Sequence, residues 1–158
     1  RAVLLTHGHA DHIAAAADFS VPVYIHQLDT ACLNDAVVNL SSFVGTPFVC
    51  PPGMEVRLLE DGMTLPVAGR TFTVLHTPGH TPGCVCFYSP TDGVLFSGDT
   101  LFAGSIGRTD FLAGSYEAII GSIRSKLLTL PDETKVYPGH GPATTIGKER
   151  RDNPFLTE

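Results

Sequence analysis

THGHADH, residues 6–12, places three histidines and one aspartate within six positions near the start of the chain. Imidazole and carboxylate groups are the side chains that first-row metals such as zinc and iron bind. Only Gly8 and Ala10 separate the four groups, and the stretch holds three of the seven histidines of the chain. Such a density of ligand-type groups is hard to explain by packing. The stretch therefore predicts a catalytic metal site.

Three later loops each place one further ligand-type residue directly after a predicted strand. The loops are HTPGHTPG (residues 76–83), SGDTLF (97–102) and PGHG (138–141). Glycine and proline beside each residue allow sharp turns and a close approach of the backbone to a shared centre. With the first stretch these loops supply five histidines and two aspartates, which is enough for two metal ions. The candidate ligands are His7, His9, Asp11, His12, His80, Asp99 and His140.

Strand-like and helix-like segments alternate along the chain, which indicates an α/β fold. Apolar stretches predict strands at residues 3–5, 21–25, 55–59, 64–67, 71–75 and 135–137, and a hairpin of 84–88 with 94–97. Helices are expected at 13–19, 27–34 and 115–128. In the last of these, apolar residues recur every three or four positions, and Ser115 is a candidate N-cap. No repeat or linker interrupts the pattern, so we expect one domain, residues 1–158.

The four loop motifs, in this order, resemble those of the metallo-β-lactamase-fold hydrolases. Residues 98–110 (GDTLFAGSIGRTD) and 137–156 (YPGHGPATTIGKERRDNPFL) are similar to the small bacterial glyoxalase II-like subgroup. The resemblance implies a four-layer αββα sandwich, in which strands precede the HxHxDH motif. Because the sequence opens at Arg1, just before the predicted strand 3–5, we expect the first N-terminal strands of this domain to be absent. The unpaired edge would favour association with another chain, so a homo-oligomer is one expected state.

The same resemblance implies a role for each candidate ligand. His7, His9 and His80 would hold a first metal ion, and Asp11, His12 and His140 a second, with Asp99 bridging both. Two zinc ions are the expected cofactors, although iron or manganese would suit the same ligands. The implied reaction is hydrolysis of a small acyl-thioester, as in hydroxyacylglutathione hydrolases, by attack of a metal-bridging hydroxide. Asp11 would also orient the nucleophile, and a glutathione thioester is the expected small-molecule substrate.

Two other interpretations remain open from the sequence. Persulfide dioxygenases of the same superfamily share GRTDF, found here at residues 107–111, and hold a single iron ion. In that case His7, His80 and Asp99 would be the ligands. Alternatively, a chain without its first strands would bind metal and be inactive. A β-lactamase is less favoured, because those enzymes generally lack the bridging aspartate that Asp99 would provide.

Composition excludes several other classes of protein. A net charge of -6 and a pI near 5.5 argue against nucleic-acid binding. No apolar run approaches the roughly 20 residues that cross a bilayer, and no signal peptide is recognisable. The four cysteines have no CxxC spacing, so we expect reduced packing residues in a cytoplasmic protein.

Three further polar residues are assigned structural roles. His76 is expected to brace its loop, and His26 to be an ordinary polar residue. Arg108 has two alternative roles, contacting a substrate carboxylate or pairing with Asp110.

Overall fold

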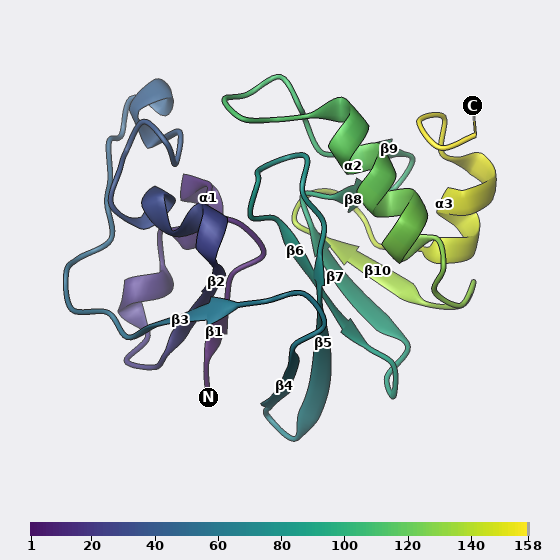
Figure 1. The fold of residues 1–158 in the computed structure, drawn as a ribbon, viewed down its shortest axis with the longest axis horizontal. Coiled ribbons are helices and arrows are strands. Elements are labelled where there is room, and N and C mark those ends of the chain that lie inside the picture. The colour runs from purple at the N-terminus through teal and green to yellow at the C-terminus, as the bar shows by residue number, and fades with distance from the viewer. Residues whose placement is uncertain (158) are drawn as a thin grey trace.

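Two β-sheets lie face to face in the computed structural model, and helices cover the outer side of each (Figure 1). The structure describes residues 1–157. The order of the layers is helix, sheet, sheet, helix, so the expected αββα sandwich is confirmed. Within residues 1–157, no helix is both long enough and apolar enough to cross a membrane.

The smaller sheet contains three parallel strands in the order β1-β2-β3, formed by β1 (Val3–Leu4), β2 (Val23–His26) and β3 (Val56–Leu59). Four short helical segments lie between its strands, beginning with α1 (Ala10–Ile13) after β1 and the 3-10 helix η2 (Gln27–Leu33) after β2. The 3-10 helix η1 (Ala16–Asp18) follows α1, and η3 (Ser41–Val44) lies in the long connection to β3.

The larger sheet has six strands in the order β11-β10-β7-β6-β5-β4. Neighbouring strands are antiparallel except for β10, which runs parallel to β7. The strands are β4 (Thr64–Val67), β5 (Arg70–His76), β6 (Val85–Ser89), β7 (Val94–Gly98), β10 (Lys135–Pro138) and β11 (Thr144–Thr145). A small hairpin of β8 (Leu101–Phe102) and β9 (Ser105–Ile106) follows β7.

Two helices cover the outer face of the larger sheet. The helix α2 (Tyr116–Ser122) continues as a π-helical segment, Ile123–Leu127, and α3 (Ile146–Asp152) lies near the C-terminal end of the chain. The Ser115 hydroxyl accepts a hydrogen bond from the amide of Ala118, so the predicted N-cap is confirmed. A side chain at this position satisfies an amide that the helix itself leaves unpaired.

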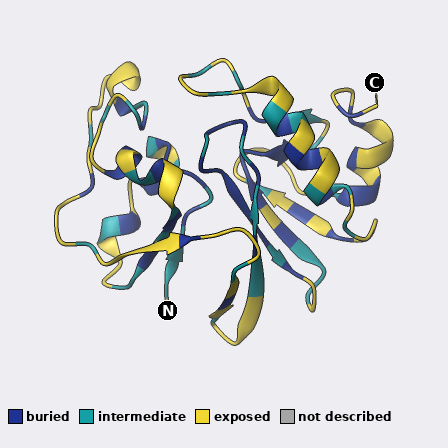
Figure 2. Ribbon diagram, viewed as in Figure 1, coloured by how far each residue is buried: buried dark blue, intermediate teal, exposed yellow. Residues whose placement is uncertain are grey.

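Three apolar clusters fill the three interfaces between the four layers. Alternation along a strand sends neighbouring side chains to opposite faces of a sheet. In β6, Val85 and Phe87 join the cluster that also holds Leu59 of β3, whereas Cys86 joins the cluster beneath α2. In β2, Val23 packs with the segments that cover the smaller sheet. Figure 2 shows this buried interior as dark blue along the strands and along the covered sides of the helices.

The helix predicted for residues 13–19 is the main local difference. The helical turn begins earlier, at Ala10, so it includes part of the THGHADH stretch, and it ends at Ile13 before the separate segment η1. Only Ile13 and Ala16 of this region are deeply buried. A short alanine-rich segment with so few buried contacts does not sustain a longer helix, because helical stability in proteins comes mostly from packing.

The four cysteines are buried free thiols, as expected for packing residues. Burial raises the pKa of Cys32 to about 12 and that of Cys86 to about 11. Thiols with such high pKa values are not reactive nucleophiles at neutral pH.

Candidate metal centre

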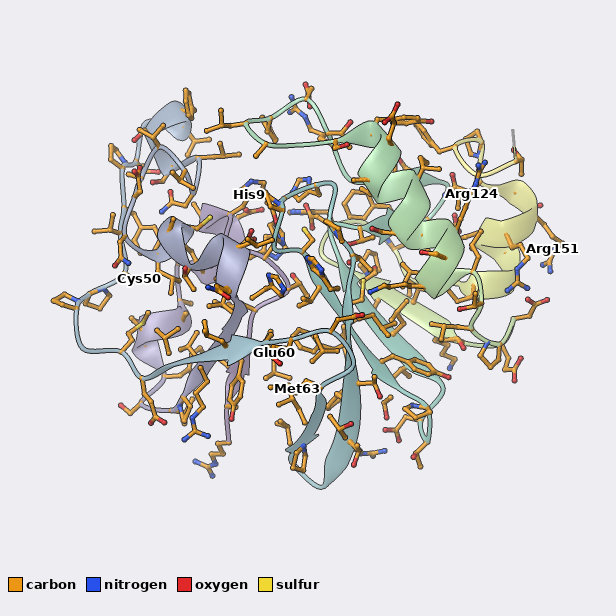
Figure 3. All side chains as sticks on the ribbon, in the orientation of Figure 1. His9, Cys50, Glu60, Met63, Arg124 and Arg151 are labelled. Atoms are coloured by element: carbon orange, nitrogen blue, oxygen red, sulfur yellow. The ribbon has the colours of Figure 1, made fainter. Side chains whose placement is uncertain are left out.

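The seven candidate ligands converge at one end of the sandwich, where loops from both sheets meet. His7 follows β1, and His9, Asp11 and His12 lie at or within α1. The loops after β5, β7 and β10 supply the other three. Figure 3 labels His9, which lies between the two halves of the molecule. Three groups have ligand atoms within 4.8 Å of one another: His7, His9 and His80; His7, His12 and Asp99; and Asp11, His12 and His140.

His80 connects the loop after β5 to the THGHADH stretch, residues 6–12. Its Nε2 atom lies 2.8 Å from Nδ1 of His9, and its Nδ1 atom lies 2.8 Å from the carbonyl oxygen of Arg108. A carbonyl oxygen only accepts hydrogen bonds, so Nδ1 of His80 carries a proton and donates to it, while Nε2 faces the cluster. This is the usual way in which a ligand histidine is oriented by its other ring nitrogen.

Asp99 lies among three of the histidines, His12, His80 and His140. Its Oδ1 atom is 3.3 Å from Nε2 of His12, and its Oδ2 atom is 3.7 Å from Nε2 of His80 and 3.5 Å from Nε2 of His140. Burial raises the pKa of this carboxyl group, but the neighbouring His12, followed by His80 and His140, outweighs burial and holds the pKa below its usual value. Asp99 is therefore a carboxylate with histidines on both sides.

Asp11 and His140 form the more open side of the cluster. Nε2 of His140 lies 3.1 Å from Oδ2 of Asp11, and Nε2 of His12 lies 3.6 Å from the same oxygen. The side chains of Asp11 and His140 are each 57% exposed. By contrast, His7 is fully buried, so the cluster runs from a closed interior to an open mouth.

The chemistry of the buried donors fits a metal ion. Nε2 of His7, Nε2 of His12 and Oδ1 of Asp99 are all buried without a hydrogen-bond partner among the described residues. Although His12 and Asp99 are close, they lack hydrogen-bond geometry. Buried polar atoms are rarely left unpaired in proteins, because the loss of water is costly. Three such atoms within one cluster are the arrangement that a bound cation would satisfy.

Burial also keeps the innermost histidines in the form that binds metals. It is the main cause that lowers the pKa of His7 well below the usual value, with the neighbouring histidines adding to it. Burial and then His80 lower the pKa of His9 to about 4. Both side chains are therefore neutral at pH 7. For His12, burial lowers the pKa, but Asp99 and Asp11 outweigh it and leave the pKa raised.

Asp29, which the sequence analysis did not single out, joins the two ligand-bearing loops. Its carboxylate is 1% exposed and accepts three hydrogen bonds. The amide of Gly8 (2.9 Å) and the hydroxyl of Thr81 (2.7 Å) donate to Oδ2, and the amide of Gly83 (2.7 Å) donates to Oδ1. Gly8 separates His7 from His9, and Thr81 follows His80. An acidic residue inside a mostly apolar 3-10 helix was the only sequence signal for this contact.

A cleft of about 900 Å³ opens above the cluster. His9, Asp11, His80, Asp99 and His140 lie along it, and its walls come from two loop segments, residues 37–44 and 102–112. Arg108 lies on one wall and donates to both carboxylate oxygens of Asp110, at 2.9 and 2.8 Å. Of the two roles considered for Arg108, the structure shows the ion pair.

His26 and His76 lie apart from the cluster. Their rings stack with centroids 4.1 Å apart, and Nε2 of His76 donates to the carbonyl oxygen of Pro82 at 2.9 Å. Neither belongs to a group of ligand atoms. His76 therefore contacts the loop that carries His80, as a bracing role requires.

Comparison with known proteins agrees with this architecture. The family model of the Metallo-beta-lactamase superfamily matches residues 1–140. A Haemophilus influenzae protein named hydroxyacylglutathione hydrolase GloC is 41% identical over 99% of this chain and 76% of its own length.

Two solved structures are also similar. The BLEG-1 B3 metallo-beta-lactamase has a TM-score of 0.94 and 46% identity, covering 99% of this chain and 77% of that one. TTHA1623 in a di-iron-bound form has a TM-score of 0.86 and 46% identity, covering 98% and 77%. With its αββα layers and its cluster of histidines and aspartates, the chain belongs to the metallo-β-lactamase superfamily.

Proposed function

We propose that this chain is a metal-dependent hydrolase of small acyl-thioesters, similar to hydroxyacylglutathione hydrolases. The observation that carries the proposal is the position of Asp99, whose two carboxylate oxygens face histidines of both ligand groups. A carboxylate so placed suits two metal ions a few ångströms apart better than one. The name of the similar GloC protein supports the choice of a glutathione thioester as substrate.

The proposed ligand sets follow the two sides of the cluster. His7, His9 and His80 would hold the buried metal ion, and Asp11, His12 and His140 would hold the ion at the open side. Asp99 would be a ligand shared by both ions, because one of its oxygens lies near His12 and the other near His80 and His140. The three unpaired buried atoms of His7, His12 and Asp99 support this assignment, because a cation would satisfy all of them. We propose zinc for both sites, since imidazole and carboxylate ligands suit it.

The residues of the chain have distinct tasks in this reaction. When bound, a pair of such metal ions supplies a water of lowered pKa as nucleophile and positive charge for the developing oxyanion. Asp11, exposed at the mouth of the cleft, would orient the nucleophile toward the thioester carbonyl. Arg108, through its carbonyl oxygen, keeps the ring of His80 in one tautomer. The cleft above Asp11 admits the substrate.

Hydrolysis and metal content test this proposal together. We expect protein purified without chelator to hold about two zinc ions per chain and to release thiol from S-lactoylglutathione. Removing the metal should abolish the activity, and adding zinc should restore it. As a control, Asp152→Asn should keep both metal content and activity, because Asp152 is exposed in α3 and lies outside the cluster. One iron ion per chain, with oxygen uptake on glutathione persulfide, would instead establish the dioxygenase alternative. Metal binding with neither activity would establish the inactive alternative.

Replacing Asp29 by asparagine is expected to weaken binding of the buried metal ion selectively. Both carboxylate oxygens of Asp29 accept hydrogen bonds, three in all. In asparagine one of these oxygens is replaced by an NH2 group, which cannot accept, so at least one donor is left unpaired. Loss of such an outer contact typically lowers metal affinity about 10–100-fold. Titration of the metal-free variant against a competing chelator would resolve the two affinities.

A matched control separates this effect from general loss of stability. Asp18→Asn removes the same charge from an exposed position in the same half of the molecule and should leave both affinities unchanged. None of Asp11, His12 and His140 is among the hydrogen-bond donors to Asp29. Equal weakening at both metal sites would therefore contradict a positioning role for Asp29.

A further inference from the structure

The walls of the cleft are apolar, although its floor is a cluster of polar groups. Segment 37–44 contributes Val37, Leu40, Phe43 and Val44 to one wall, and segment 102–112 contributes Phe102, Phe111 and Leu112 to the other. In Figure 1 these are the segment around η3 and the loop before α2, which both lie at the top of the view. Substrate that reaches the cluster must pass between these two apolar walls.

Three large side chains on the rims are strongly exposed. Phe43 is 74% exposed, and Val44 and Leu112 are each 72% exposed. They come from both walls and line the same cleft. Exposed apolar side chains gathered around one concave site mark a place where an apolar group binds, because its binding removes their surface from water.

The charged groups along the cleft are already engaged. Asp11 and Asp99 face the histidines, and Arg108 is paired with both oxygens of Asp110. The guanidinium of Arg108 also lies over the ring of Phe111, 4.0 Å from its centroid. Among the described residues that line the cleft, no lysine or arginine is left for the two carboxylates of a glutathionyl group. The walls therefore do not match the polar thiol half of a thioester.

We propose that the apolar walls bind the acyl half of the substrate, and that the preferred substrates carry an apolar acyl chain. This inference rests on the proposed thioester hydrolysis. Carrier thiols are polar and charged, so the half of a thioester that suits Phe43, Val44 and Leu112 is the acyl chain. The carbonyl carbon of the thioester then lies at the cluster, and its acyl chain lies between segments 37–44 and 102–112. The thiol half of the substrate points to solvent.

Glutathione thioesters of increasing acyl length test the proposal with a constant leaving group. From S-acetyl through S-butyryl and S-hexanoyl to S-octanoylglutathione, we expect kcat/KM to rise about two- to fourfold per methylene, as for partial to full burial of each CH2 group. S-octanoylglutathione should then be a better substrate than S-lactoylglutathione. Equal kcat/KM along the series would overturn the proposal while leaving thioester hydrolysis established. Absence of hydrolysis for every thioester would overturn the proposed function.

Binding of thioethers separates recognition from catalysis. S-methyl- and S-octylglutathione cannot be hydrolysed, and calorimetry should show tighter binding of the octyl compound to the metal-loaded protein. Equal binding of the two would overturn the assignment of the walls.

Variants of residues on the rims of the cleft show where the acyl chain of the substrate binds. Phe43→Ser and Leu112→Ser should each reduce the dependence on acyl length, with a loss that grows from the acetyl to the octanoyl substrate. Phe19→Ser is the matched control, because Phe19 is also well exposed but lies outside the cleft. If Phe43→Ser instead converts a dimer to a monomer and acyl length has no effect, the walls are an interface between copies of the chain and the proposal is wrong.

Discussion

Asp99→Asn is expected to lower kcat/KM by about 1000-fold, because a Lewis-acidic metal ion contributes several kcal/mol of stabilisation to the transition state. Asparagine keeps the shape of the side chain but offers one oxygen and no charge. The wild-type carboxylate faces His12 with one oxygen, and His80 and His140 with the other. We therefore expect the variant to lose one of its two metal ions, which elemental analysis and steady-state kinetics would measure together.

The control for this prediction is Asp152→Asn. Asp152 is an exposed carboxylate at the end of α3 and should affect neither metal content nor turnover when it is replaced. An Asp99→Asn protein that retains two metal ions and near-normal kcat/KM would show that Asp99 does not bridge them. Circular dichroism of both variants would establish that each is folded.

Gly107→Ala is expected to destabilise the protein by roughly 3 kcal/mol, the upper range for overpacking, and to lower Tm by about 10 °C. A Cβ atom at this position would lie on top of the backbone carbonyl oxygen of Asp99 and 3.3 Å from Cβ of His80. A backbone carbonyl cannot rotate away as a side chain would, so the loop after β9 has to move. Thermal and denaturant unfolding of the metal-free protein would measure the loss.

Gly121→Ala is a control in which replacing a glycine should raise the stability of the protein. Gly121 lies inside α2, and a Cβ atom there would meet nothing within 4 Å. Alanine is favoured over glycine in a helix by about 1 kcal/mol, so this variant should be more stable than the wild type. If Gly107→Ala has the same stability as the wild type, the close approach of residue 107 to Asp99 is not a constraint on the fold.

Strands were the most predictable part of the fold, because each carries its own signal. The stretch predicted at 64–67 coincides with β4, and the predicted hairpin coincides with β6 and β7 to within one residue at each end. Each of them is a short apolar stretch of sequence, which made these strands recognisable. The two-residue strands β8, β9 and β11 were missed, since two residues are too few to form a recognisable apolar pattern.

The candidate site was predictable as a set of residues but not as a set of contacts. Histidine and aspartate residues beside glycine were enough to predict which side chains converge in space. Asp29 was missed, because its partners Gly8, Thr81 and Gly83 are 21 or more positions away. The apolar walls were missed for a similar reason: Phe43 and Leu112 become neighbours of one cleft only when both loops are in place.

The division of the candidate ligands between the two sheets would make folding and metal binding linked equilibria. His7, His9, Asp11 and His12 follow a strand of the smaller sheet, whereas His80, Asp99 and His140 follow strands of the larger one. An ion held by both sets binds the folded state and not the separated halves. The free energy of unfolding then depends on free metal concentration, rising by about 2.7 kcal/mol when that concentration is 100 times the dissociation constant. The concentration of free metal in the surroundings would thereby set the fraction of chains that is folded.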